Sequence, residues 1–303
     1  MNTERNQAIM KRMRRLEIQT RRQVDDTLSG QYHSVFKGRG LNFDEVREYV
    51  AGDEVRTIDW NVTARAGRPF VKKFTEEREL TILLMVDVSA SGNFGSAAQS
   101  KRELAAEIAS VLAFSAIRNH DKVGLVLYSD QIEEYIAPKS GRSHVMRMVR
   151  EVLFYEPKGR GTDTVRALDF ANRVTRRKAI VFLLSDFQSP VEGALNLSNL
   201  RRAMKQTSRR HDLVALHIQD AREKSLPDVG IVALEDAETG EVVEINTADP
   251  HVRERFAAEV AQLHGELQRN LRSEGIDTLE LDTATPYLPV LQRFFKNRQR
   301  KRS

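Results

Sequence analysis

From residue 80 onward, short apolar runs alternate with long helical patterns, and this alternation leaves few folds open to the chain. The runs at residues 80–86, 179–184 and 213–218 are rich in β-forming residues and almost uncharged, as strands buried on both faces of a parallel sheet are. Helical patterns occupy residues 97–119, 198–207 and 249–273. We therefore predict an α/β fold with a doubly wound, mostly parallel sheet.

The chain has 303 residues, enough for one large domain with extensions. We expect a basic N-terminal helix at 1–30 and a segment rich in arginine and aromatic residues at 31–78. The α/β domain should span 79–285, including a hairpin at 231–246, and a C-terminal helix with a basic tail should follow at 286–303. Within 31–78 the sequence predicts a small irregular subdomain and does not assign its strands or helices.

Composition excludes several classes of function. The chain has no cysteine, which excludes disulfides, zinc–thiolate sites and cysteine nucleophiles and fits a reducing compartment. We find no signal-peptide pattern and no apolar stretch near the roughly 20 residues that cross a bilayer. We therefore expect a cytoplasmic protein without a membrane span.

The net charge of +5 is concentrated at the two ends of the chain. Basic ends can contact nucleic acid, anionic lipid or an acidic partner through charge alone. We favour a solvated helix face and a frayed tail, and keep nucleic-acid binding as an alternative.

Polar side chains follow two of the predicted strands. Asp87-x-Ser89-x-Ser91 comes directly after the run at 80–86, and Asp186 follows the run at 179–184. Thr162 lies in a glycine-rich loop before a helix. The carboxyl ends of parallel strands share one edge of the sheet, where ligands bind, and hard oxygen ligands suit Mg²⁺.

Each of these residues also has a structural explanation. Ser89 or Ser91 could cap a helix, and Asp186 could stabilise a turn. Taken together, however, the five residues favour a metal site for Mg²⁺, with Mn²⁺ or Ca²⁺ as alternatives. The predicted ligands are Asp87, Ser89, Ser91, Thr162 and Asp186.

The main enzymatic alternative is a metal-dependent phosphohydrolase, in which an aspartate at a strand end becomes phosphorylated. Ser89 stands where haloacid-dehalogenase-like phosphatases usually carry a second aspartate, which argues against this class. The serines lack the flanking glycines of a nucleophile elbow, and the loops at 38–40 and 159–161 lack the end of a nucleotide P-loop. We therefore predict no catalytic residue, no enzyme activity and no small-molecule substrate.

Arginines, acids and aromatic residues are dense between residues 36 and 65. They could form a recognition surface, because arginine and aromatic side chains are favoured interface anchors. They could equally be tied to one another by internal ion pairs, and the sequence leaves both possibilities open. The residues are Arg39, Arg47, Tyr49, Asp53, Arg56, Asp59, Trp60 and Arg65.

Two resemblances cover most of the chain. The pattern Asp87-x-Ser89-x-Ser91, with Thr162 and Asp186, resembles the metal-ion-dependent adhesion site of von Willebrand factor type A domains. A second stretch is similar to the signature of the bacterial domain-of-unknown-function 58 family. It comprises Phe36-Lys-Gly-Arg-Gly40, Arg47-Glu-Tyr49, Gly52-Asp53, Arg56-Thr-Ile-Asp59-Trp60 and Ala64-Arg65.

The resemblance implies a von Willebrand factor type A-like fold and a non-enzymatic interaction module. Asp87, Ser89, Ser91 and Thr162 would contact magnesium directly or through water, Asp186 would hold a metal-bound water, and an acidic residue of a protein partner would complete the coordination. Genes of this family commonly lie beside those of MoxR-type AAA+ ATPases, which implies such an ATPase as partner in protein maturation or stress response. Gly92-Asn93 departs from the family, whose members often have methionine after the serines.

Overall fold

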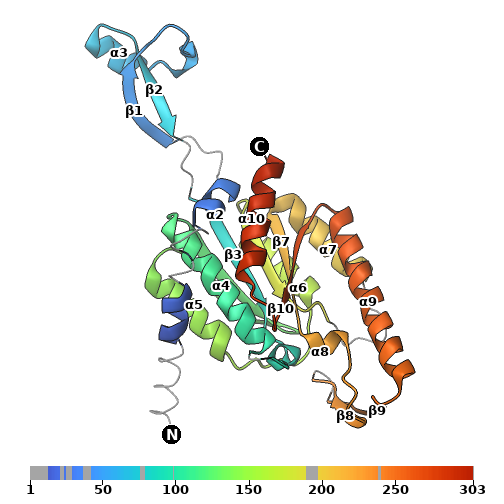
Figure 1. Cartoon of the computed structure of the whole chain (residues 1–303). Helices are drawn as coiled ribbons and strands as arrows, with labels where there is room; N and C mark the ends of the chain where they lie inside the picture. The colour runs from blue at the N-terminus through green and yellow to red at the C-terminus, as the bar shows by residue number, and fades with distance from the viewer. Residues whose placement is uncertain are drawn as a thin grey trace.

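The computed structural model describes residues 13–20, 24, 29–36, 42–75, 79–97, 99–188, 197–237 and 240–302. Its centre is a six-stranded sheet with the order β10-β7-β6-β3-β4-β5. All neighbouring strands pair in parallel except β4 and β5. The predicted doubly wound, mostly parallel α/β sheet is therefore confirmed (Figure 1). The strands are β3 (Thr81–Asp87), β4 (Lys122–Tyr128), β5 (Ile132–Lys139), β6 (Ile180–Ser185), β7 (Asp212–Gln219) and β10 (Asp277–Asp282).

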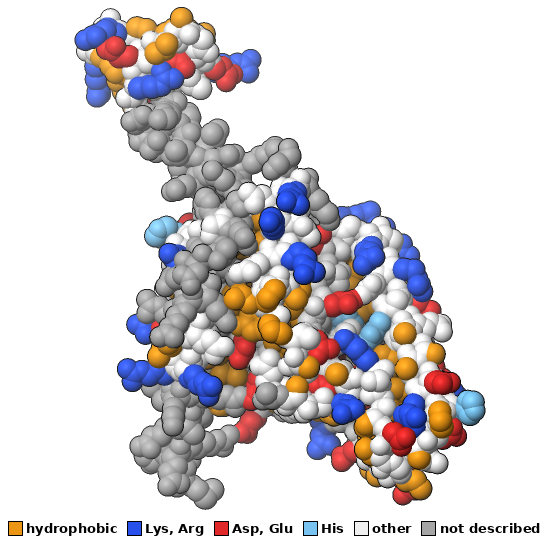
Figure 2. Space-filling model, in the orientation of Figure 1, with side chains coloured by type: hydrophobic (Ala, Val, Ile, Leu, Met, Phe, Trp, Pro, Cys, Tyr) orange, Lys and Arg blue, Asp and Glu red, His pale blue; other side chains and the backbone are white. Residues whose placement is uncertain are grey.

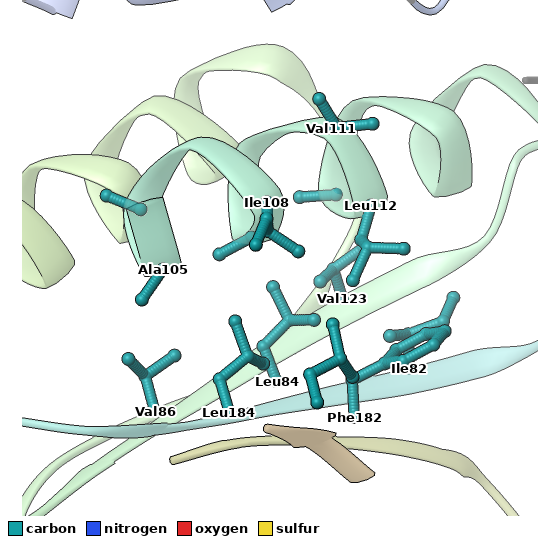
Figure 3. Close-up of a cluster of buried hydrophobic side chains, with 14 of the residues drawn as sticks. Ile82, Leu84, Val86, Ala105, Ile108, Val111, Leu112, Val123, Phe182 and Leu184 are labelled. Carbon is teal, nitrogen blue, oxygen red and sulfur yellow. The ribbon is translucent and has the colours of Figure 1, made fainter. Parts of the chain in front are cut away.

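Helices cover both faces of the sheet, because alternate residues of each strand point to opposite sides. Ile82, Leu84 and Val86 of β3 pack against one helical layer, as Figure 3 shows for Ile108 and its neighbours. Leu83 and Met85 belong to the second apolar cluster, on the other face. The first layer contains α2 (Ser29–Phe36), α4 (Lys101–Arg118), α5 (Arg142–Phe154) and α10 (Leu288–Arg302), and the second contains α6 (Thr164–Val174), α7 (Leu197–Arg210) and α9 (Pro250–Ser273).

The local sequence fixes where helix α4 begins, and the start of this helix lies beside the candidate site. Ser100 accepts a hydrogen bond from the amide of Glu103, whose carboxylate accepts one from the amide of Ser100. This capping box satisfies two amides at the start of the helix. Almost every residue that follows is buried, as expected for a helix packed along the middle of a sheet.

Residues 42–75 form a small unit of their own, which projects from the body (Figure 1). Strand β1 (Asn42–Glu48) pairs antiparallel with β2 (Phe70–Thr75), and the short helices η2 (Val55–Thr57) and α3 (Trp60–Ala66) lie between them. Asp59 caps α3 by accepting from two backbone amides, and Gly67 ends it with φ 68°, a conformation that favours glycine. The segment predicted as irregular therefore contains regular structure.

Helix α2 belongs to the body and not to this unit, although the sequence placed residues 31–36 in the same segment as the arginine-rich stretch. Its Phe36 ring lies 5.8 Å from the Phe182 ring and 5.9 Å from the Phe295 ring. The reason is burial: Phe36 and Tyr32 fill the layer beside α10 and contribute to the main core.

Asp121, which precedes β4, ties together the two chain segments that flank the projecting unit. Its Oδ2 accepts from the Tyr32 hydroxyl of α2 at 3.2 Å, and its Oδ1 accepts from the Leu80 amide, just before β3, at 2.8 Å. A single buried carboxylate thus joins α2 to the residue that precedes β3.

The remaining predicted elements are present where they are described. The hairpin consists of β8 (Ile231–Glu235) and β9 (Val242–Asn246), and the short helix α8 (Ala221–Lys224) precedes it. Residues 13–20 of the N-terminal segment are helical, whereas residues 1–12 lie outside the described part. The basic tail continues α10 to Arg302, and within it Arg298 is buried. None of the helices described here is long and apolar enough to cross a membrane.

Candidate functional site

The candidate site lies where the order of the sheet reverses. From β3 the chain proceeds to β4 and β5 on one side, whereas β6 leads to β7 and β10 on the other. The crevice outside the carboxyl ends of two such strands is the usual ligand position in open α/β sheets. Asp87 is the last residue of β3 and Asp186 follows directly after β6, so both carboxylates stand at this point.

Asp87 is held by its own turn and by the neighbouring strand. Its Oδ1 accepts from the Ser89 amide at 3.0 Å, and its Oδ2 accepts from the Ser185 hydroxyl at 2.8 Å. The Ser89 and Ser91 hydroxyl oxygens lie 3.1 Å apart in the turn that leads into η3 (Ala90–Asn93). Asp87, Ser89, Ser91 and Ser185 are all buried, and their side chains form a compact group of hard oxygen atoms.

The crevice disfavours the charged form of Asp87. Burial and, second to it, the nearby Asp186 charge raise the pKa of Asp87 to about 6, although hydrogen bonds from Ser89 and Ser185 oppose the rise. A cation between the two carboxylates would relieve this repulsion. The crevice therefore favours a positive charge beside its carboxylates, and Lys101 supplies one at Asp186.

Asp186 is fixed through its backbone and its side chain. Its Oδ1 accepts from the Gln188 amide at 3.1 Å, and its Oδ2 accepts from Lys101 Nζ at 2.5 Å. Its backbone carbonyl accepts from His217 Nε2 at 3.0 Å. Burial lowers the pKa of His217 to about 3, so this ring is neutral and its one N–H points to Asp186. Phe187 adopts φ 54°, a strained conformation for a bulky residue.

Lys101 is the residue that sequence reasoning missed. It is the first residue of α4, its side chain is 3% exposed, and its ammonium group also donates to Glu223 Oε1 of α8 at 2.5 Å. A lysine at the start of a helix resembles any solvated lysine, and Glu223 lies far along the chain. The sequence carries no signal that would pair them.

Thr162 lies in a neighbouring loop, which Glu133 of β5 positions. Glu133 Oε1 accepts from the Lys158 and Gly159 amides at 3.0 and 2.8 Å. The Arg160 carbonyl of the same loop accepts from the Ala90 amide at 3.1 Å, which places the loop against the serine turn. Thr162 itself does not line the cavity formed by Asp87, Ser89, Ser91 and Asp186.

Replacement of Glu133 by alanine is expected to loosen this loop. The variant leaves the Lys158 and Gly159 amides without their acceptor, so their protection from hydrogen exchange should fall by at least about tenfold. Amide exchange read by NMR would measure this. Glu134→Ala is the matched control, because the Glu134 carboxylate only faces Arg147 at 3.6 Å. Equal protection in the two variants would show that Glu133 does not hold the loop.

The cavity between these side chains fits a single small cation. Its volume is about 20 Å³, room for one water-sized species. Its oxygen donors are two carboxylates and three hydroxyls, that of Ser185 included, which are ligands suited to Mg²⁺. Lys101 and Arg102 also line it. In the described ranges, no three or more His, Cys, Asp or Glu side chains group as a metal site, so this centre would depend on its serines. Four of the five predicted ligands line the cavity and are compatible with the ion, Thr162 does not line it, and metal binding stays a prediction.

A large groove opens beside the cavity. Its volume is about 750 Å³, and its walls come from η3, α8, the β8–β9 hairpin and α9. Val232, Leu234, Val243 and Ile245 of the hairpin line it, and the register pairs them across the two strands. Figure 2 shows apolar side chains gathered over this hairpin. Ser91 lines both the groove and the cavity, so the groove leads to the candidate ion.

The arginine-rich stretch divides into internal and exposed residues. Arg47 donates to both carboxylate oxygens of Asp53, at 2.9 and 2.7 Å, and Asp59 caps α3, so these residues stabilise the projecting unit. Trp60 is 67% exposed, and Arg56 and Arg65 are also exposed. Tyr49 is half-buried, and Arg39 lies outside the described residues. Internal pairing therefore accounts for Arg47 and Asp53, while a recognition surface at the exposed residues stays a prediction.

Comparison with known proteins identifies the family. A family model described as Protein of unknown function DUF58 matches residues 45–266, and the chain belongs to this family. Uncharacterized protein Rv1480 of Mycobacterium tuberculosis is 33% identical over 290 residues, which cover 95% of this chain and 89% of the relative.

Solved structures with a similar arrangement share little sequence. The conserved hypothetical protein BatB from Bacteroides thetaiotaomicron is 14% identical, with a TM-score of 0.45 over 73% of this chain and 99% of BatB. The SpRpn10 VWA domain is 11% identical, with a TM-score of 0.39 over 73% of this chain and 95% of that domain.

Proposed function

We propose that this protein is a non-enzymatic interaction module that binds a protein partner through a magnesium-dependent site. The observation that supports this is the crevice at the sheet reversal, where Asp87, Ser89, Ser91 and Asp186 enclose a cavity of ion size. A bound Mg²⁺ would supply a positive charge that can accept a carboxylate from outside the chain. Asp87 and the two serines would hold the ion, and Asp186 would orient water beside it.

The groove supports binding to a protein segment. A partner carboxylate could reach the cavity past Ser91, while apolar side chains beside it would lie against Leu234 and Val243 of the hairpin. The partner we propose is a MoxR-type AAA+ ATPase in protein maturation or stress response, which the family resemblance suggests.

The exposed residues of the projecting unit offer a second contact for the same partner. Trp60 and the neighbouring Arg56 and Arg65 have the composition of an interface anchor for an acidic surface. Figure 2 shows basic and apolar side chains side by side on this unit. A protein bound at two separate points gains affinity through the high effective concentration of the second contact.

Asp87→Ala tests the metal-dependent interaction. We expect the full-length variant to bind Mg²⁺ about 100-fold more weakly, because it loses the central carboxylate of the site. Partner proteins captured on the wild-type chain with Mg²⁺ should elute with chelator, and the variant should not retain them. Asp169→Ala, an exposed aspartate on α6, is the control and should behave as the wild type. Chelator-resistant binding by a folded Asp87→Ala protein would exclude the metal-dependent interaction.

One observation favours the alternative of a metal-dependent phosphohydrolase. Lys101 lies in the same cavity as two aspartates, and lysines beside carboxylates stabilise transferring phosphoryl groups. Its ammonium group, however, already donates to Asp186 and Glu223, which leaves it little capacity for a phosphate. Hydrolysis of a generic phosphate ester that is lost in Asp87→Asn would establish this alternative instead.

A further inference from the structure

A built-in cation occupies one side of the candidate metal centre. Lys101 lines the cavity together with Asp87, Ser89 and Asp186. Its ammonium group lies 2.5 Å from Asp186 Oδ2 and 2.5 Å from Glu223 Oε1. The positive charge that balances Asp186 in the structure therefore comes from the chain itself.

Apart from its two ion pairs, the surroundings of Lys101 disfavour a cation. It is the first residue of α4, and the positive end of a helix disfavours a cation. Burying a lysine is also costly unless carboxylates pair with it. The two carboxylates are thus what keeps this side chain in place.

We propose that Lys101 and the divalent cation compete for Asp186, and that metal binding leaves Lys101 paired with Glu223 alone. This inference rests on the proposed metal site and adds how that site is regulated. Two cations at one buried carboxylate repel each other strongly. Glu223 can keep Lys101 paired after the exchange, because its Oε2 is anchored by the Asp220 amide at 3.0 Å.

The exchange would connect the ion with the groove. Glu223 lines the groove, and the ion pair that it forms with Lys101 joins this wall to the start of α4. When the metal takes over Asp186, the ammonium charge shifts towards the wall that a partner would contact. Occupancy of the cavity would therefore change the charge distribution in the groove, so that the metal and the partner influence each other's affinity.

Binding of Mn²⁺ to the full chain, measured by isothermal titration calorimetry, tests the exchange. Lys101→Met removes the competing cation and is expected to raise the affinity about tenfold or more. Glu223→Gln removes the alternative partner of Lys101 and one negative charge, and is expected to lower the affinity about tenfold. Lys122→Met is the control, because its ion pair with Glu79 is partly exposed on the surface. Mn²⁺ should also raise the melting temperature of Lys101→Met more than that of the wild type.

The opposite signs of the two effects separate the exchange from general damage to the fold, which would weaken binding in both variants. If Lys101→Met folds and binds Mn²⁺ no more tightly than the wild type, the exchange is wrong, although the metal site stands. If Lys101→Met fails to fold, Glu223→Gln decides instead. A Mn²⁺ affinity of Glu223→Gln equal to that of the wild type would show that the exchange is wrong. Absence of Mn²⁺ binding in the wild type and in every variant overturns the metal site and the exchange together.

Discussion

Replacement of Asp220 by alanine is expected to lower the free energy of unfolding by about 3 kcal/mol. The Asp220 side chain is fully buried and accepts hydrogen bonds from the amide and hydroxyl of Ser96 and from the Thr283 hydroxyl at 2.5 to 2.9 Å. It also accepts from the Arg222 amide at the start of α8. Alanine would leave the buried Thr283 hydroxyl, and the Ser96 donors at the edge of the cluster, without this acceptor.

The same residue predicts a dependence on pH. Burial alone would raise the pKa of Asp220, but hydrogen bonds from Ser96 and Thr283 outweigh it and lower the pKa to about 2. Because the pKa is lower in the folded than in the unfolded protein, this stabilisation is complete above about pH 4 and is lost as the pH falls toward 2.

Urea denaturation of Asp220→Ala and of the wild type at several pH values would check both expectations. The difference between the two proteins should be largest near neutral pH and shrink below about pH 4. Asp228→Ala is the control, since the Asp228 side chain is 63% exposed and its contact with Arg253 is long. If Asp220→Ala lowers the free energy of unfolding no more than Asp228→Ala does, this hydrogen-bond cluster does not stabilise the fold.

Arg298→Ala is expected to cost about 4 kcal/mol of stability. Arg298 is buried, pairs with Asp212 of β7 and with Asp277 of β10, and lies 4.8 Å over the Phe36 ring. Its removal would take away the ion pairs with these two carboxylates and the contact with the Phe36 ring.

Denaturant unfolding of Arg298→Ala beside Arg300→Ala would test this. Arg300 is exposed on the same helix, so its loss should change stability by no more than about 0.5 kcal/mol. Similar stability of the two variants would mean that the ion pairs of Arg298 contribute little beyond the cost of burying them.

Sequence patterns predicted the sheet well because burial on both faces requires continuous apolar runs. The strands β3, β6 and β7 follow this rule, and the oxygen-bearing residues Asp87 and Asp186 fall at their carboxyl ends as expected. The spacing of Ser89 and Ser91 also predicted their proximity, since a turn brings alternate residues together. The placement of these side chains could therefore be inferred from local pattern and sheet geometry.

Other features depend on contacts between distant parts of the chain. Strand β1, with the sequence NFDEVRE, carries too many charges to be recognised, although Asp59 and Gly67 are a cap and a stop that could have revealed α3. Lys101 and Arg298 look like surface cations in the sequence. Their burial depends in part on Asp186 and Asp212, which lie more than 80 residues away along the chain, and no periodic pattern records such pairs.

The carboxylate of Asp121 gives the projecting unit a mechanical property. A pull on residues 42–75 would reach the body through Tyr32 on one side and Leu80 on the other, and both donate to this single group. On one side the pull would continue along the chain into β3, whose parallel pairing with β4 and β6 would resist it in shear. On the other side it would act on a helix whose Tyr32 and Phe36 are buried in the core, so tension on the unit is borne by the interior of the body.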